Sequence, residues 1–298
     1  MAVARPRDDS RAGKGRRRGT CRSVHAVSSP VPVLNGRLGD LLRHWRSLRG
    51  KSQLELASDA GTTPRYMSFV ETGRAQPSRQ MVVRLARALD VPLRERNQLL
   101  LAAGFAPLYS LEPLTSPVME RVDQALTSML TQHEPFPAVI MDRGWNLQRA
   151  NTGAARLFGR LFAPQPMPTE ANVLRLVIEP GPVRDHIANW TQVVPALLER
   201  ARHEAVGGVL DPPSAELVGA LRARPDVAEL LAAPDLSAPP VPVVDLRFDI
   251  DGAVLAFFSV VSTVGTPIDV TAQELRLEAF FPADDTTRHR WIDAITST

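Results

Sequence analysis

The chain has one cysteine, few aromatic residues and no long apolar run, and each shortage narrows what the protein can be. Because Cys21 is the only cysteine among 298 residues, no internal disulfide can form, and a reducing, cytoplasmic setting is expected. No apolar stretch approaches the roughly 18–20 residues of a membrane helix, and no apolar segment follows the basic N-terminus as in a secretory signal. We therefore expect a globular protein of two domains without a membrane partner.

The sequence also lacks the motifs of several enzyme classes. It contains no GxSxG nucleophile elbow, no P-loop, no GxGxxG and no HExxH. The six histidines show no metal-ligand spacing. Asp245, Asp249 and Asp251 alternate along a predicted strand, and we interpret them as a solvated face rather than paired catalytic carboxylates. The sequence therefore predicts no enzyme, no cofactor and no metal site.

Charge is distributed unevenly along the chain. Residues 1–30 hold 8 Lys or Arg against 2 Asp or Glu, and residues 31–110 hold 12 against 6. Residues 111–298 reverse the balance, with 15 against 24. A basic front part on an acidic body indicates that only the front part faces a polyanion, and nucleic acid is the first candidate. Solvated helices give the same charge pattern, so charge alone leaves both interpretations open.

Composition and periodicity divide the chain into four parts. Residues 1–34 are rich in Arg, Ser, Gly and Pro and are predicted to be a disordered basic tail. Residues 35–104 are predicted to be an all-α unit of five helices, and residues 105–116 a linker. Residues 117–298 are predicted to be an α+β domain, with strands at about 138–142, 145–149, 243–250, 253–264 and 274–281 and a helical middle over 170–231.

The stretch GTTPRYMSFVETG, residues 61–73, has the signals of a helix that follows a tight turn. Gly61 tolerates the positive φ that such a turn needs, Thr63 is a good N-cap, and Pro64 suits the first helical position. Met67 and Val70, three residues apart, are expected to pack back on the preceding helix, which Ser52 caps. The remaining side of the predicted helix then points outward.

That outward side combines residue types suited to the major groove of DNA. Arginine can donate two hydrogen bonds to guanine, serine and threonine serve bases or phosphates, and phenylalanine can contact a thymine methyl group. The helix N-termini at Gln53 and Thr63 suit phosphates. The predicted DNA contacts are Gln53, Thr63, Arg65, Tyr66, Ser68, Phe69, Thr72, Arg74 and Arg79. Packing of Phe69 on another subunit or on the C-terminal domain is an alternative that the sequence leaves open.

Two resemblances rest on these residues. The segment QLELASDAGTTPRYMSFVET resembles the helix-turn-helix of the Cro and repressor (XRE-like) family, although Pro64 stands where many relatives place a base-contacting residue. The stretch YMSFVETGRAQPSRQMVVRLARALDVPLRERNQLLLAAGFAP and the tract FFSVVSTVGTPIDVTAQELRLEAFFPAD resemble regulators with an MmyB-like ligand-binding domain. Together the resemblances imply a Cro/repressor-like five-helix domain and an α+β, PAS-like sensor of a small apolar or fatty-acid-like molecule. A helix-turn-helix protein of this kind is expected to bind a roughly palindromic double-stranded DNA operator as a homodimer.

The block RDHIANWTQVV, residues 184–194, carries the candidate ligand-binding residues Arg184, His186, Asn189 and Trp190. Helical spacing would place the last three on one side, where polar groups beside an aromatic ring could orient a ligand head group. Arg184 could pair with a carboxylate. A structural histidine and a helix-packing tryptophan explain the same pattern, so both interpretations stand.

A rival interpretation keeps the helix-turn-helix but makes the C-terminal domain a ligand-free dimerisation or protein-interaction module. The predicted helix over 117–132 has an apolar stripe suited to either role, formed by Val118, Val122, Ala125, Leu126 and Met129. The sequence does not decide between the two.

Overall fold

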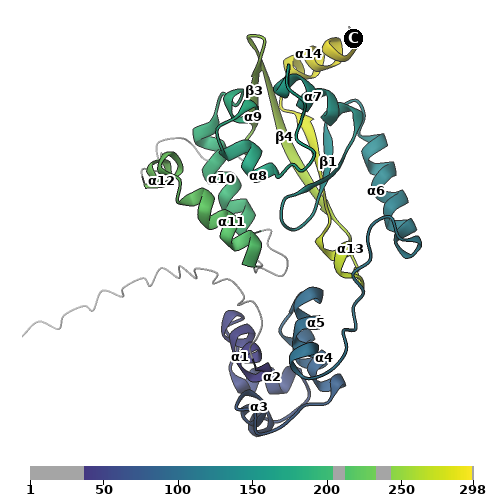
Figure 1. Cartoon of the computed structure of the whole chain (residues 1–298), viewed down its shortest axis with the longest axis vertical. Coiled ribbons are helices and arrows are strands. Elements are labelled where there is room, and N and C mark those ends of the chain that lie inside the picture. The colour runs from purple at the N-terminus through teal and green to yellow at the C-terminus, as the bar shows by residue number, and fades with distance from the viewer. Residues whose placement is uncertain (1–36, 204–211, 233–242, 297–298) are drawn as a thin grey trace, which may run out of the picture.

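Helices make up the N-terminal part of the protein, and a sheet with helices on both faces makes up the rest. The computed structural model describes residues 37–203, 212–232 and 243–296, so the predicted tail 1–34 lies outside the described residues (Figure 1). The fold class expected from the sequence, an all-α helix-turn-helix unit followed by an α+β PAS-like domain, is confirmed.

The described part of the N-terminal unit folds into five helices, three of which begin at a side-chain cap, Ser52, Thr63 or Ser78. They are α1 (Leu38–Leu48), α2 (Gln53–Asp59), α3 (Pro64–Glu71), α4 (Arg79–Ala88) and α5 (Leu93–Ala102). Each contributes apolar residues to one core, in which Trp45, Leu56 and Met67 are fully buried. Burial of these side chains stabilises the unit, since each contributes about 1.5–3 kcal/mol relative to exposure.

The C-terminal domain is built on an antiparallel sheet. Its strands are β1 (Ala138–Met141), β2 (Leu147–Ala150), β3 (Leu246–Ile250), β4 (Ala253–Thr263) and β5 (Arg276–Pro282), in the order β2-β1-β5-β4-β3. The hairpin between β3 and β4 turns at Asp251 and Gly252, both at positive φ.

Helices cover both faces of the sheet. One face carries α7 (Thr152–Phe162), α8 (Val173–Ile178), α9 (Pro182–Asp185), α10 (Trp190–His203), α11 (Pro212–Arg222) and α12 (Pro225–Ala232) (Figure 1). The other face carries α6 (Glu120–Gln132), which follows the short helix η1 (Pro117–Met119). Strand alternation supplies both cores: in β1, Val139 and Met141 face the large core, while Ala138 and Ile140 face α6.

Two elements differ from the sequence predictions. The continuous helix expected over 184–194 is wrong, because α9 ends at Asp185 and α10 begins at Trp190. The segment between them joins β3 instead: Ile187 pairs with Phe248, and the Ala188 N–H donates to the Arg247 carbonyl at 2.8 Å. No sequence signal indicated the short helix α13 (Val270–Glu274), which precedes β5 and packs against α5. The last described helix is α14 (Asp285–Thr296).

Candidate nucleic-acid interface and ligand cavity

Helices α2 and α3 are set at a fixed angle by their caps and by the turn between them. Ser52 and Glu55 form a capping box at the start of α2, since each side chain accepts from the backbone N–H of the other. Gly61 adopts φ +63° in the turn, and the Thr62 N–H donates to the Ala57 carbonyl at 2.8 Å. In the whole molecule, α3 lies at the end remote from the sheet (Figure 1).

The outward side of α3 carries an arginine stacked on a phenylalanine. The Arg65 guanidinium lies over the Phe69 ring, 5.5 Å from its centroid, and this contact explains why both residue types occur on one side of a short helix. Arg65 is exposed and Phe69 half-buried, so the pair presents a charged and an apolar surface together. Ser68 is half-buried, and the Thr72 hydroxyl donates to the Ser68 carbonyl at 2.7 Å.

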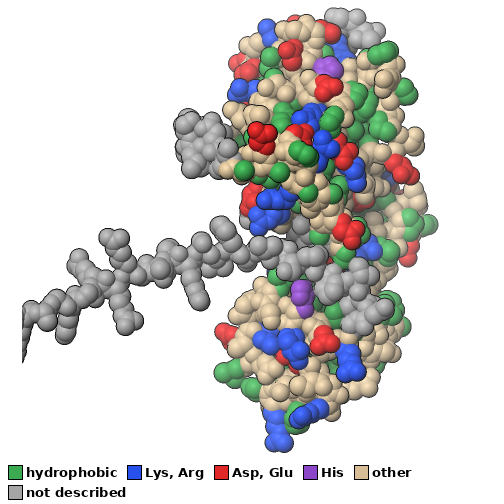
Figure 2. All heavy atoms as spheres, turned by 60° about the vertical axis from the view of Figure 1, so that its left-hand side comes forward, with side chains coloured by type: hydrophobic (Ala, Val, Ile, Leu, Met, Phe, Trp, Pro, Cys, Tyr) green, Lys and Arg blue, Asp and Glu red, His purple; other side chains and the backbone are tan. Residues whose placement is uncertain are grey.

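The other predicted DNA contacts have diverse surroundings. Thr63 is exposed and its hydroxyl accepts from the Tyr66 N–H at 3.2 Å, whereas the Tyr66 side chain is half-buried against the helical core. Arg74 and Arg79 are both exposed beyond α3, and Arg79 Nη2 donates to the Ala106 carbonyl at 3.4 Å. On the face shown in Figure 2, basic side chains outnumber acidic ones over the lower part, which holds these helices.

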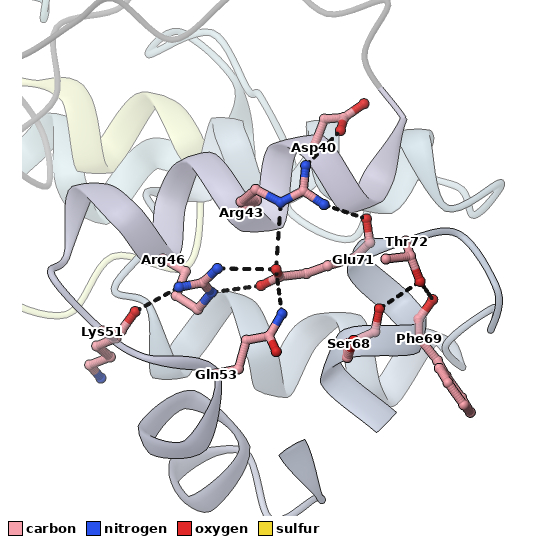
Figure 3. Close-up of polar contacts among 9 residues, drawn as sticks. All are labelled: Asp40, Arg43, Arg46, Lys51, Gln53, Ser68, Phe69, Glu71 and Thr72. Carbon is pink, nitrogen blue, oxygen red and sulfur yellow. Dashed lines mark hydrogen bonds and ion pairs between the residues drawn. The ribbon is translucent and has the colours of Figure 1, made fainter. Parts of the chain in front are cut away.

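Gln53 takes part in a buried polar cluster centred on Glu71, which sequence reasoning missed (Figure 3). The Glu71 side chain is only 1% exposed and accepts two hydrogen bonds from Arg46, at 2.6 and 3.1 Å. Gln53 Nε2 donates a third at 2.9 Å, and Arg43 Nη2 donates to the Glu71 carbonyl at 3.1 Å. The cluster therefore ties α1 and the first residue of α2 to the last residue of α3.

The charge of Glu71 is stabilised despite its burial. Burial alone would raise the pKa of Glu71, but hydrogen bonds from Arg46 and Gln53 and the charges of Arg46 and Arg43 outweigh it and hold the pKa below its usual value. The close approach of α1 depends on Gly39, because a Cβ there would lie 2.3 Å from the Glu71 carbonyl oxygen.

The C-terminal domain contains a largely apolar cavity of about 390 Å³ between the sheet and α8 and α10. This volume lies within the range typical of small-molecule sites. The lining residues are Trp145, Val173, Val177, Val193, Ala196, Leu197, Arg200, Val243, Val244, Leu246, Phe257, Ser259, Val261, Glu278 and Phe280. They come from widely separated segments, which is why no single stretch of sequence indicated the site.

Three polar side chains in the cavity wall are bonded to one another. Arg200 Nη1 donates to Glu278 Oε1 at 2.6 Å and to Ser259 Oγ at 3.4 Å. The Arg200 guanidinium also lies 5.0 Å from the centroid of the Trp145 ring. Glu278 is buried, so its charge is matched mainly by the neighbouring Arg200. The cavity thus combines apolar walls with one compact, internally neutralised polar group.

The four residues predicted to bind ligand lie together, although none of them lines this cavity. Arg184 stacks on Trp190, 3.8 Å from the ring centroid, and pairs with Asp226 at 2.5 Å. Trp190 Nε1 donates to a backbone carbonyl, Asn189 bonds two backbone groups around β3, and His186 Nδ1 lies 2.6 Å from the Pro182 carbonyl oxygen. Each of these side chains therefore has a partner within the protein.

The turn between β1 and β2 reaches both the cavity and the N-terminal unit. Trp145, in the cavity wall, has φ +66°, a strained value for a bulky residue. Asp142 holds the turn, because its Oδ1 accepts from the Gly144 and Asn146 N–H groups at 2.8 and 3.0 Å. The Arg143 side chain points away to the contact with α5.

At that contact, buried charges join α5 to α13 and the turn. Arg143 donates to Glu95 of α5 at 3.0 Å and to Glu274 of α13 at 2.8 Å. Arg94 of α5 binds both Glu274 oxygens at 2.8 Å, and the Leu93 N–H donates to the Gln273 side chain at 2.7 Å. Arg94, Glu95, Arg143 and Glu274 constitute the interdomain charge cluster.

Glu95 is a buried charge of this cluster whose pKa is raised. Burial raises the pKa of Glu95, and the opposing effect of the Arg143 charge and hydrogen bond is smaller. The Glu95 side chain is only 4% exposed, so its burial depends on the two domains staying in contact. The ionised form of Glu95 therefore opposes the contact, and Arg143 offsets only part of that cost.

Two negative findings concern the described residues only. Within residues 37–203, 212–232 and 243–296, no group of three or more His, Cys, Asp or Glu side chains is arranged to hold a metal ion. No helix in this part of the chain has the length and apolar character needed to cross a membrane.

Comparison with known families matches both parts of the chain. A helix-turn-helix domain family matches residues 37–99, and the family described as the MmyB-like transcription regulator ligand binding domain matches residues 122–291. Neither is a family of enzymes. Both resemblances expected from the sequence are thereby confirmed.

Curated relatives match only a short part of the chain. It is 32% identical over 66 residues to multi-protein-binding factor 1 of Yarrowia lipolytica, which is 22% of this chain and 43% of the relative. It is 33% identical over 76 residues to multiprotein-bridging factor 1 of Debaryomyces hansenii, which is 25% of this chain and 51% of the relative. The chain thus spans about half the length of these relatives.

Proposed function

Because the chain belongs to the MmyB-like transcription regulators, we propose that its C-terminal domain binds a small, largely apolar molecule and thereby sets how tightly the helix-turn-helix binds DNA. The outward side of α3, with Arg65 stacked on Phe69, carries the DNA-binding half of this proposal. Arg65, Ser68 and Phe69 would read base edges in the major groove, while Arg74 and Arg79 would contact phosphates.

The protein would act as a homodimer. A dimer presents two copies of α3, and a spacing of about 34–36 Å between them fits successive major grooves on one side of a roughly palindromic operator. On the sensor, α6 buries Leu126 and Leu130 beneath the sheet but leaves Met129 exposed, and Val118 of the preceding η1 is exposed as well, so part of this apolar stripe is available for a partner.

A double substitution, Arg65→Ala with Ser68→Ala, tests the reading role of α3. Against a duplex selected from a random pool by the wild-type protein, we expect a loss of about 1–3 kcal/mol per base contact. Binding to random DNA and the slope of affinity with salt should change little, because the phosphate contacts remain. Fluorescence anisotropy across a salt titration measures both quantities.

The control is Arg87→Ala, which removes another exposed arginine, from α4. Equal weakening on selected and random duplexes by the α3 variant would reassign Arg65 to a phosphate contact. A wild-type protein that selects no sequence would refute operator recognition. The sequence of the selected DNA also shows whether the operator is palindromic. A single half-site bound as tightly as the full operator would contradict the dimer.

The cavity in the C-terminal domain supports the ligand-binding half of the proposal. Ala196→Phe places an aromatic ring in the cavity wall and should abolish the fluorescence gain of Nile red, a neutral apolar dye. Val260→Phe is the matched control, since Val260 is exposed on β4 and does not line the cavity. Circular dichroism would show whether either variant loses structure. Unchanged dye binding in a folded Ala196→Phe protein would place the dye elsewhere and favour the ligand-free interaction module.

The turn between β1 and β2 is the proposed link between ligand and DNA. Trp145 forms part of the cavity wall, and Arg143, two residues earlier, holds α5 of the DNA-binding unit. Arg276 fixes the turn by donating to the carbonyls of Asp142 and Arg143, at 3.2 and 2.9 Å. A ligand that prefers one position of Trp145 would bias Arg143, and would change DNA affinity only by its differential binding to the two arrangements.

A further inference from the structure

The polar group in the cavity wall constrains which ligand can bind. It consists of Arg200 on α10, Ser259 on β4 and Glu278 on β5, and the remaining wall is apolar. A site of this kind accepts a molecule with an apolar body and one small polar head. Which charge that head can carry depends on the hydrogen bonds and the ion pair that already join the three side chains.

We propose that the ligand is a neutral amphiphile, with an apolar body and a hydroxyl or amide head, rather than a fatty-acid anion. This inference rests on the proposed ligand-binding function and specifies the chemical class of the ligand. It follows from the 2.6 Å contact of Arg200 Nη1 with Glu278 Oε1, which brings both charges into the cavity wall together.

An anionic head is disfavoured at this site. A ligand carboxylate within hydrogen-bond distance of Arg200 would also lie close to the carboxylate of Glu278. Two negative charges in a poorly hydrated space repel strongly, and Glu278 is too buried for water to screen them. The attraction of Arg200 is already satisfied by Glu278, so the ligand would gain little to offset this repulsion.

A cationic head meets the opposite difficulty. An ammonium beside Glu278 would lie close to the Arg200 guanidinium, which is held there by its ion pair and by the Trp145 ring. A hydroxyl or amide avoids both repulsions. It can donate to Glu278 and accept from Ser259 or Arg200, so that each buried polar group keeps a partner.

The test compares three probes that share a ten-carbon chain and differ in the head. Decanol, decanoate and decylammonium compete with Nile red for the full-length wild-type protein at pH 8, where the acid is ionised and the amine protonated. We expect decanol to bind about tenfold more tightly than either charged probe. Decanoate binding as tightly as decanol, or more tightly, would overturn the proposal.

Removing one charge should change the order in a defined direction. Glu278→Gln removes the carboxylate that repels an anionic head and that Arg200 contacts at 2.6 Å, so decanoate should gain about tenfold while decanol changes little. Arg200→Gln is the mirror variant and should favour decylammonium, which keeps the idea testable if one variant fails to fold. An unchanged order of the three probes in a folded variant would contradict the role of the ion pair.

The design separates this inference from the function on which it rests. If Nile red and all three probes fail to bind the folded wild-type protein, the ligand-binding proposal itself fails. If they bind and Ala196→Phe blocks them, the cavity is the binding site. The relative affinities of the three probes then test whether the ligand head is neutral.

Discussion

Replacing Glu71 with alanine should destabilise the helical unit by about 3–5 kcal/mol, the usual cost of removing one partner of a buried ion pair. The Glu71 carboxylate accepts from Arg46 and Gln53, and Arg43 lies 3.7 Å from it. Without it, the largely buried Arg46 guanidinium loses its ion-pair partner and α3 loses its bond to the start of α2. DNA binding should weaken with the fold, because α3 would no longer be held at a fixed angle.

Hydrogen exchange of the full-length protein measures this effect locally, because it reports the opening of individual segments. Amides of α1 to α3 should lose protection, while those of the sheet should keep theirs. Asp40→Asn is the matched control: it removes an exposed carboxylate of the same unit, paired with Arg43 at 3.4 Å. Such surface pairs contribute about 0–1 kcal/mol. Equal effects of the two substitutions would show that the Glu71 cluster does not stabilise the unit.

The pH dependence of this stabilisation has a definite sign. The pKa of Glu71 is lower in the folded protein than its usual value of 4.5, so its contribution is complete above that value. It is lost as the pH falls through the folded pKa. The gap in exchange protection between wild type and Glu71→Gln should therefore be constant at neutral pH and shrink only below about pH 4.5.

The helical unit was predictable because its signals are local. Ser52, Thr63 and Gly61 mark caps and a turn within a few residues of the groups they bond, and their positions follow from spacing alone. Glu71 was missed because its partner Arg46 lies 25 residues away, and nothing in the sequence distinguishes it from an exposed glutamate. Long-range burial, rather than propensity, decides the role of such a residue.

The ligand site was less predictable for the same reason. The cavity brings together Trp145, Arg200 and Glu278 from three distant segments, whereas the sequence drew attention to one contiguous block. In that block, helical periodicity continued through Ile187, but pairing with Phe248 of β3 interrupted the helix. A tertiary contact thus overrode a local pattern, which single-sequence reasoning has no means to detect.

Replacing Arg143 with methionine should separate the two domains and abolish their communication. Methionine preserves much of the side-chain length but leaves Glu95 and Glu274 buried together without the bridging charge. Burial already raises the pKa of Glu95, so the loss of Arg143 makes its charged form still less tolerable. Opening the contact lets both carboxylates reach water, and we expect the open arrangement to predominate.

Two measurements distinguish this outcome from general damage. Small-angle scattering should show an increased radius of gyration, and a ligand found by the cavity assays should no longer alter DNA affinity. The coupling free energy between ligand and DNA, typically 1–3 kcal/mol in allosteric proteins, should fall towards zero while each site still binds its own partner. Arg149→Met is the control, because Arg149 pairs with Asp123 within the C-terminal domain. Retained coupling in a folded Arg143→Met protein would exclude the turn as the link.

A second substitution tests whether the charge of Glu95 causes the two domains to separate. Adding Glu95→Gln to Arg143→Met removes the buried carboxylate that Arg143 no longer neutralises, so the double variant should close again in part. Lowering the pH should also favour the closed arrangement of the single variant Arg143→Met. The closed form binds a proton on Glu95 more tightly than the open form, so closure should strengthen as the pH falls towards the usual pKa of 4.5. If neither the second substitution nor acid restores contact, Arg143 acts through packing rather than by neutralising Glu95.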